Sequence, residues 1–175
     1  MPNVCTEDGA YMEQLTNLVI SDRELAIIST ALNKLMNDTG ATSVMLLDKS
    51  GQVITTLGTG TQRNATTLGA LLAGAFSSSR HVAELLGEKD FRTIFQQGVR
   101  ENIYTTMVEE QWLLVIVFDK LTHIGLVKVL SKKASDELGR ILERVRADTT
   151  RTKSSVINVQ FRSSVEDTID LLFRD

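Results

Sequence analysis

The spacing of hydrophobic residues predicts that the first long element of this chain is an amphipathic helix. Near the N-terminus, apolar residues recur every three or four positions, as on one face of an α-helix: Leu25, Ile28, Leu32 and Leu35. Ser21 and Glu24 form a capping box, so the helix is expected to begin at Asp22. Gly40 suits the left-handed conformation that ends many helices.

Short, continuous apolar runs predict a hairpin after this helix. Val44–Leu47 and Val53–Leu57 are strand-like, and Asp48–Gly51 between them has the composition of a tight turn. Further along, Phe91–Gln97 is expected to be a strand that precedes a second hairpin. That hairpin is expected from two runs that flank Glu109 and Glu110, namely Ile103–Val108 and Trp112–Phe118.

A small-residue helix is predicted between the two groups of strands, from about Thr67 to Gly87. One face is expected to pack in the core, and it carries Leu68, Leu71, Leu72, Ala75, Val82, Leu85 and Leu86. The other face is expected to be open, and it carries Ala70, Ala73, Ser77, His81 and Glu84. A last amphipathic helix is predicted from about Thr122 to Arg146.

The order of these elements predicts an α/β sandwich in which a central antiparallel five-stranded sheet lies between helices. Phe91–Gln97 is then an edge strand whose main chain is open to another strand. In a homodimer it pairs with the same strand of a second copy and extends the sheet. The residues expected to make this contact are Phe91, Thr93, Ile94 and Phe95.

The two ends of the chain differ from the middle in composition. Residues 1–16 are expected to form a flexible arm, residues 17–146 the domain, and residues 147–162 a linker. A second capping box, Ser163 with Glu166, predicts an amphipathic tail helix over residues 163–175. Its apolar stripe is Val165, Ile169, Leu172 and Phe173. This stripe either binds a groove on a partner or packs back on its own domain.

Composition and charge narrow the functional classes. The 175 residues carry a formal net charge of −3, and no basic stripe is present, so nucleic-acid binding is not expected. No apolar run is long enough to span a bilayer and the N-terminus does not resemble a signal peptide, so we expect a cytoplasmic protein without membrane insertion. Cys5 is the single cysteine, which excludes a disulfide within the chain.

Side chains that carry catalysis are not grouped in this sequence. His81 and His123 each lack a second histidine at helical ligand spacing, and Glu109 with Glu110 sits at an exposed turn. No hydrolase, metalloprotease or phosphate-loop motif occurs. We therefore expect no active site, no metal and no cofactor, and a protein that works by binding another protein.

The chain resembles the roadblock/dynein light chain family from about Leu18 to Phe173. The resemblance is carried by the order and spacing of several segments: LLDKSGQVI, TTLGALLAGAF, LLGEKDF, GVRENIYTTMVEEQWLLVIVFD, GLVKV, KKASDELGRI and SVEDTIDLLF. It implies a roadblock-type sandwich that forms homodimers, with the sheets joined at the third strand and the second helices side by side.

Within that family, the chain is most similar to bacterial members that regulate a small Ras-like GTPase. The resemblance implies a homodimer that binds an MglA-type GTPase in its GTP-bound state and activates hydrolysis without supplying an arginine, in the control of cell polarity and motility. It implies recruitment to a cell pole and a tail helix that promotes nucleotide exchange. The residues expected to face the GTPase are Ala70, Ala73, Gly74, Ser77, His81 and Glu84.

Arg80 and His81 depart from the family pattern, because this helix face is otherwise lined by small residues. Large side chains there are expected either to block a close approach or to select a different GTPase. Two alternatives to an activator remain open. One is a roadblock-type scaffold that binds a GTPase or another protein without accelerating hydrolysis, and the other is a small-molecule sensor domain.

Overall fold

This computed structural model describes residues 20–147, of which residues 21–141 form one compact unit. The predicted N-terminal arm, nearly all of the predicted linker and the predicted tail helix lie outside the described residues. The elements follow the predicted order: α2 Asp22–Thr39, β1 Ser43–Asp48, β2 Val53–Gly58, the short 3-10 turn η1 Gln62–Asn64, α3 Ala65–Leu85, β3 Thr93–Gln97, β4 Glu101–Val108, β5 Trp112–Asp119 and a helix over residues 124–147.

Helix α2 begins and ends at the predicted residues. The Ser21 hydroxyl accepts a hydrogen bond from the Glu24 amide, and the Glu24 carboxylate accepts one from the Ser21 amide at 2.8 Å, so the capping box is complete. Gly40 adopts φ 71° and donates its N–H to the carbonyl of Met36. Both ends of the helix therefore have partners for main-chain groups that a helix leaves unpaired.

The five strands form one antiparallel sheet in the order β2-β1-β5-β4-β3. Strand β5 lies in the centre, and its residues Trp112–Phe118 are all buried, as the longest apolar run of the sequence predicts. Strands β2 and β3 are the two edges. The predicted five-stranded antiparallel sheet is confirmed, and so is the position of the third strand at an edge.

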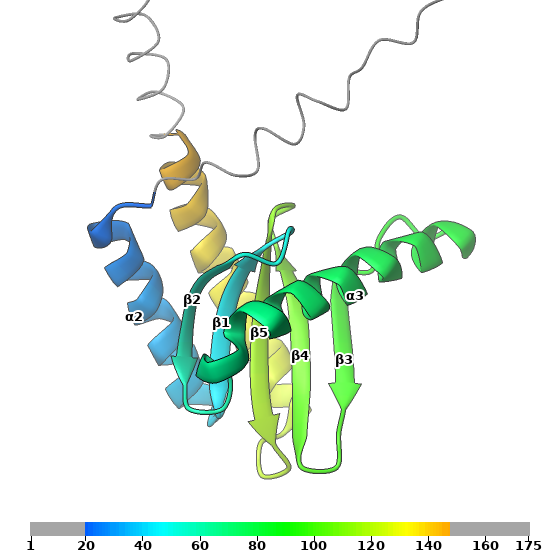
Figure 1. The fold of residues 1–175 in the computed structure, drawn as a ribbon, viewed down its shortest axis with the longest axis horizontal. Coiled ribbons are helices and arrows are strands. Elements are labelled where there is room, and N and C mark those ends of the chain that lie inside the picture. Colours follow the sequence, from blue (N-terminus) through cyan, green and yellow to red (C-terminus); the bar gives the residue numbers. More distant parts are fainter. Residues whose placement is uncertain (1–19, 148–175) are drawn as a thin grey trace, which may run out of the picture. The chain divides into compact units, whose positions relative to one another are not determined.

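Helices cover both faces of the sheet (Figure 1). Helix α3 crosses one face, while α2 and the part of the last helix up to residue 141 lie on the other. Alternate strand residues point to the α3 side and pack there against α3. This core cluster consists of Met45, Leu47, Leu72, Ala73, Phe76, Met107, Leu113, Val115 and Val117.

Two glycines set the distance between α3 and the first hairpin. Gly51 in the turn between β1 and β2 has φ 90°, and a Cβ placed on it would lie 2.7 Å from the Cα of Ala70. A Cβ on Gly69 of α3 would lie 2.6 Å from the carbonyl oxygen of Gly51. The helix and the turn therefore meet main chain to main chain, which only residues without a Cβ permit.

Three hydroxyl groups fix the segment that leads from β2 into α3. The Thr61 hydroxyl lies 2.9 Å from the Ser43 hydroxyl of β1 and 3.1 Å from the Thr56 hydroxyl of β2. Ser43 and Thr61 are buried, so each hydroxyl satisfies a polar group that has lost contact with water. This cluster and the glycine contact together position the start of α3.

Candidate functional site

The outward face of α3 and the neighbouring edge strand β3 form the candidate site. Both are open in the isolated chain, because α3 packs on the sheet with only part of its circumference and β3 has a strand partner on one side only. The buried residues of α3 are Gly69, Leu72, Ala73, Phe76 and Ala83, and three of them, Leu72, Ala73 and Phe76, belong to the core cluster on the sheet.

Two predictions about the faces of α3 were wrong. Ala73, which we expected on the open face, is only 5% exposed and belongs to the core cluster. Leu71, which we expected in the core, is 66% exposed, and Leu85 is 87% exposed. The other members of the predicted core stripe that are exposed are Ala75, Val82 and Leu86.

The contact at Gly69 explains which side of α3 faces the sheet. Gly69 touches the turn at Gly51, so the start of the helix lies close to the first hairpin, and Ala73 packs in the core cluster between Leu72 and Phe76. A leucine at position 73 would overpack this part of the core. The hydrophobic pattern alone favours the larger side chains for the core, and it therefore selects the wrong side of a helix that is apolar on two sides.

The remaining residues predicted to face a GTPase share one exposed stripe. Ala70, Gly74, Ser77, His81 and Glu84 follow each other at intervals of three or four residues, and all five are exposed. No atom lies within 4 Å of a Cβ built on Gly74, so this face is free of other parts of the described chain at its centre. The Nδ1 atom of His81 lies 3.2 Å from the carbonyl oxygen of Ser77.

A second exposed stripe, which is apolar, runs beside the first. It consists of Leu71, Ala75, Val82, Leu85 and Leu86, and we call it the apolar stripe of α3. Figure 1 shows that the C-terminal end of α3, which carries the last three of these residues, extends beyond β3. Large exposed apolar side chains that gather in one place mark an interaction surface.

The edge strand has an apolar and a polar part. Phe95 is 41% exposed and stacks on the buried ring of Phe118, with the ring centroids 6.2 Å apart. Thr93 is exposed, and Ile94 is half-buried against the core cluster. Phe91 lies before the first residue of β3 and is also half-buried, so the prediction that it belongs to the strand was wrong.

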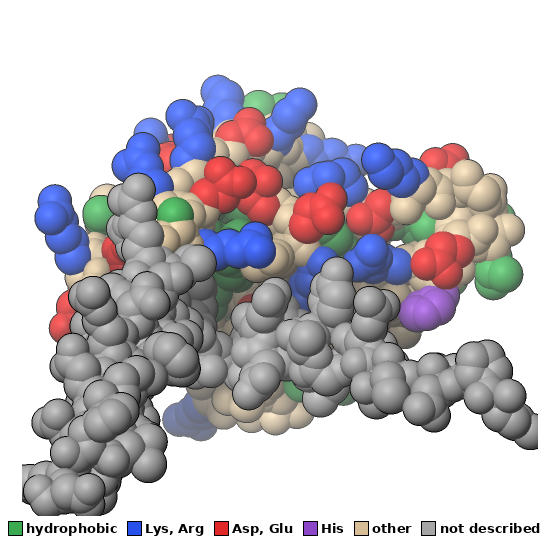
Figure 2. All heavy atoms as spheres, turned by 90° about the horizontal axis from the view of Figure 1, so that it is seen from above, with side chains coloured by type: hydrophobic (Ala, Val, Ile, Leu, Met, Phe, Trp, Pro, Cys, Tyr) green, Lys and Arg blue, Asp and Glu red, His purple; other side chains and the backbone are tan. Residues whose placement is uncertain are grey.

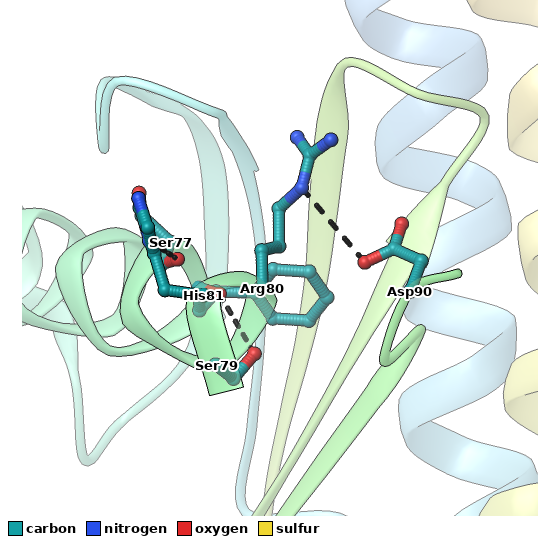
Figure 3. A network of polar contacts seen from close by, with 6 residues as sticks. Ser77, Ser79, Arg80, His81 and Asp90 are labelled. Carbon is teal, nitrogen blue, oxygen red and sulfur yellow. Dashed lines mark hydrogen bonds and ion pairs between the residues drawn. The ribbon is translucent and has the colours of Figure 1, made fainter. Parts of the chain in front are cut away.

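Arg80 does not lie along the exposed stripe. Figure 3 shows its side chain reaching toward Asp90, which lies between α3 and β3, while Ser77 and His81 lie on the other side of Arg80. Its Nε atom is 3.8 Å from Oδ1 of Asp90. The expectation that Arg80 stands on the open face is therefore corrected, whereas His81 is exposed on that face.

Charges of both signs are mixed around this ion pair. Burial lowers the pKa of Lys49, the nearby Arg80 guanidinium lowers it further, and the carboxylates of Glu110 and Asp90 act in the opposite direction. Figure 2 shows lysine, arginine and acidic side chains interspersed on the face that it presents. That face offers no field of a single sign such as a nucleic acid requires.

Residues that hold a metal or cross a membrane do not group within the described chain. Over residues 20–147, no three histidine, cysteine or acidic side chains lie close enough together to bind a metal ion. Over the same residues, no helix combines the length and the hydropathy that a membrane span needs. The exposed features of the site are the two stripes of α3 and the open edge of β3.

Sequence reasoning missed that Asp90 and Lys49 lie near Arg80. Asp90 occurs in the segment LLGEKDF, but nothing in its spacing relates it to Arg80 ten residues earlier. Lys49 comes from the first hairpin, and only the folded chain brings it near α3. Contacts of this kind depend on the path of a loop, which the hydrophobic pattern does not describe.

Comparisons with known proteins agree with this geometry. The model of the Roadblock/LC7 domain matches residues 27–118. Myxococcus xanthus MglB is 38% identical, with 73% of this chain and 96% of that chain covered and a TM-score of 0.67. The gliding protein MglB from Thermus thermophilus is 32% identical, with coverage of 73% and 97% and a TM-score of 0.68. An MglB with a tetrameric arrangement is 30% identical, with coverage of 74% and 97% and a TM-score of 0.70. No curated protein sequence matches the chain.

Proposed function

The chain belongs to the Roadblock/LC7 family, and we propose on that basis that it is a homodimeric regulator of a small Ras-like GTPase. The partner is a GTPase of the MglA type in its GTP-bound state, and the protein activates its GTP hydrolysis in the control of cell polarity and gliding motility. The observation that carries this proposal is the likeness to three MglB structures over nearly their full length, one of which is described as a gliding protein.

The exposed stripe of α3 is the proposed surface for the GTPase. Ala70, Gly74 and Ser77 are small, so another protein can approach the helix main chain closely, while His81 and Glu84 supply polar contacts at the far end of the stripe. Ala73 lies on the inner side of α3, where it packs in the core cluster against the sheet. Its proposed part in GTPase binding is therefore indirect, through the position of the helix.

The apolar stripe of α3 and the edge of β3 are the proposed dimer contact. Two copies related by a twofold axis bring the same surfaces together, so an open strand and an apolar helix end can both be covered at once. Thr93, Ile94 and Phe95 would lie at the joined edge, and Phe91 just before it. Leu85 and Leu86, which water surrounds in the single chain, would be buried by the second copy.

The proposed mechanism requires no catalytic side chain from this protein. A regulator accelerates hydrolysis if it binds the GTPase more tightly in the arrangement that resembles the transition state than in the resting one. In the described residues, α3 carries one arginine, and its Nε atom lies 3.8 Å from Oδ1 of Asp90. The surface thus acts by holding the GTPase so that the residues of the GTPase itself reach the phosphate.

The tail has a separate proposed part. Val165, Ile169, Leu172 and Phe173 lie outside the described residues, and we retain the proposal that their stripe binds the GTPase at a second place and promotes nucleotide exchange. Deletion of residues 163–175 is then expected to leave the dimer intact and to change the rate of nucleotide release. Unchanged kinetics would contradict this part alone.

The decisive experiment measures phosphate release from a GTP-loaded MglA-type GTPase with and without this protein. We expect Gly74→Arg to abolish both complex formation and acceleration, because the arginine would stand in the centre of the exposed stripe. Val129→Arg places the same side chain at an exposed position of the last helix and serves as the matched control. Binding without acceleration would leave a scaffold, and normal binding by Gly74→Arg would exclude this face.

The dimer is tested in the same way with two matched leucines. Leu85 and Leu121 are both 87% exposed in the single chain, but only Leu85 belongs to the apolar stripe of α3. Leu85→Asp should shift the sedimentation coefficient from that of a dimer to that of a monomer, and Leu121→Asp should not. Equal behaviour of the two variants would contradict the proposed dimer surface.

A further inference from the structure

Arg80 is the single lysine or arginine between Ala65 and Leu85, and its side chain can lie in two directions. A long side chain on a helix lies over the turn before its own Cα, which for residue 80 is the turn that contains Ser77. Ser77 belongs to the exposed stripe, so an arginine in that position would cover it. In the structure the side chain instead reaches toward Asp90, away from Ser77 (Figure 3).

Asp90 is well placed to keep the arginine there. Its loop is held at both ends, because the amide of Glu88 donates to the carbonyl of Ala83 at 2.9 Å and the amide of Met107 donates to the carbonyl of Arg92 at 3.0 Å. The carboxylate is therefore carried by a segment that is tied to α3 on one side and to β4 on the other. Of the two partners, the arginine has the greater freedom to move.

The Asp90 carboxylate needs a cation. Its Oδ1 atom is shielded from water and accepts no hydrogen bond within the described residues, while Arg80 Nε lies 3.8 Å away. A buried carboxylate oxygen without a donor is unfavourable unless a positive charge compensates it. Lys49 also lies within electrostatic range of both residues, and its pKa is lowered chiefly by burial. Glu110 balances the charge of Lys49 on the side of the second hairpin.

We propose that Asp90 is a positioning residue that holds Arg80 off the exposed stripe of α3 and so keeps that stripe open to the GTPase. This inference rests on the proposed function. Arg80 departs from the small-residue pattern of this helix face. When its side chain is held toward Asp90, the GTPase can still approach the stripe. Neither Asp90 nor Arg80 touches the GTPase in this arrangement.

The expected effect is modest because the pair is partly open to water, with side-chain exposures of 48% for Arg80 and 23% for Asp90. A partly exposed ion pair shifts a conformational equilibrium about fivefold at most. The GTPase affinity should therefore change by about that factor when the pair is broken. A complete loss of binding would point to a different role.

The first test compares four full-length proteins: wild type, Asp90→Asn, Arg80→Ala and the double variant. Each is titrated with the GTPase loaded with a non-hydrolysable GTP analogue. Asp90→Asn should weaken binding about fivefold, Arg80→Ala should bind at least as tightly as wild type, and the double variant should match Arg80→Ala. This rescue separates positioning from a structural role, since an unstable loop would not be repaired by removing Arg80.

Three results would overturn the proposal. Weaker binding by Arg80→Ala would make Arg80 a contact residue. A double variant as weak as Asp90→Asn would mean that Asp90 acts through its loop and β3. Unchanged binding by Asp90→Asn would mean that Arg80 is not held. The sedimentation coefficient of each variant serves as the control, and it should remain that of the wild type.

A second test requires no GTPase and separates failure of this inference from failure of the proposed function. In a Cys5→Ser background, Ser77→Cys introduces one thiol on the exposed stripe, and its alkylation rate by iodoacetamide is measured at neutral pH. If Asp90→Asn releases Arg80 over residue 77, the guanidinium lowers the thiol pKa and raises the rate about threefold. Adding Arg80→Ala should remove the increase. An increase that persists without Arg80, or no increase at all, would refute the proposal.

Discussion

The contact between Gly69 and Gly51 leads to a prediction with an internal control. Gly69→Ala adds a Cβ that would lie 2.6 Å from the carbonyl oxygen of Gly51 and 3.2 Å from a methyl group of Val53. The oxygen belongs to a turn that has little room to move away from α3, because Gly51 itself has φ 90° and packs against the main chain of Ala70. Helix α3 or the turn must therefore move, and overpacking of this kind costs about 1–3 kcal/mol.

Gly74→Ala makes the same chemical change in the same helix without the contact. Replacing glycine by alanine inside an exposed helix stabilises it by about 1 kcal/mol, and no atom lies within 4 Å of a Cβ on Gly74. Gly69→Ala gains the same helical preference, but the overpacking at Gly51 destabilises it. The free energies of unfolding of the two variants should thus differ by about 1–3 kcal/mol, with Gly74→Ala the more stable.

Equilibrium unfolding in urea measures this difference directly. The chain has one tryptophan, Trp112, which is buried at the start of β5 and reports loss of the sheet by fluorescence. Wild type, Gly69→Ala and Gly74→Ala should have the same slope with denaturant and different midpoints. If the two alanine variants are stabilised equally, the main-chain contact between α3 and the first hairpin does not exist in solution.

Four further predictions concern local interactions. Ser21→Ala should lower the free energy of unfolding by about 1 kcal/mol through loss of the helix cap. Hydrogen bonds from Ser21 lower the pKa of Glu24 below its ordinary value of 4.5. Their contribution to the free energy of unfolding is therefore present above pH 4.5 and is lost as the pH falls through the lowered folded-state pKa. Urea unfolding measured at a series of acidic pH values detects this loss. Glu109 has φ 48°, a left-handed conformation that glycine adopts with less strain. Glu109→Gly should therefore raise the free energy of unfolding by up to about 1 kcal/mol and the melting temperature slightly. A lower melting temperature would contradict this reasoning. Thr61→Val should cost about 1–3 kcal/mol in urea unfolding, since it leaves the buried Ser43 hydroxyl without this partner, and a neutral result would contradict the hydroxyl cluster.

Local signals in the sequence predict the framework well because the interactions that make them are local. Ser21 and Glu24 lie three residues apart, and the capping box that they form is complete within one turn. Gly40 provides a left-handed helix end for the same reason. The buried run from Trp112 to Phe118 is apolar at every position and therefore predicts a central strand whatever surrounds it.

The candidate site was less predictable, because it depends on which of two apolar helix sides meets the sheet. Leu71 is the larger residue and Ala73 the smaller, and the pattern favours the larger one for the core. Gly69 decides the orientation, since its contact with Gly51 requires residue 69 to face the sheet. Residues 72, 73 and 76 then face inward with it, and Leu71 points outward. A contact between residues distant in sequence thus decides the orientation of α3, and a single sequence holds no direct record of it.

In the proposed dimer, the open edge of β3 bears on how the chain distinguishes a second copy of itself from related proteins. Main-chain N–H and C=O groups are the same in every protein, so a bare strand edge pairs with any strand of matching length and twist. A cell that contains several proteins of this fold therefore cannot sort them through backbone pairing. In the proposed dimer, the discrimination between self and paralogue would fall to exposed side chains of the joined surfaces, which here are Phe95 of β3 and Leu85 and Leu86 at the C-terminal end of α3. Duplicated copies of such a gene would separate into independent dimers by changes at these few positions, while the sheet itself stayed the same.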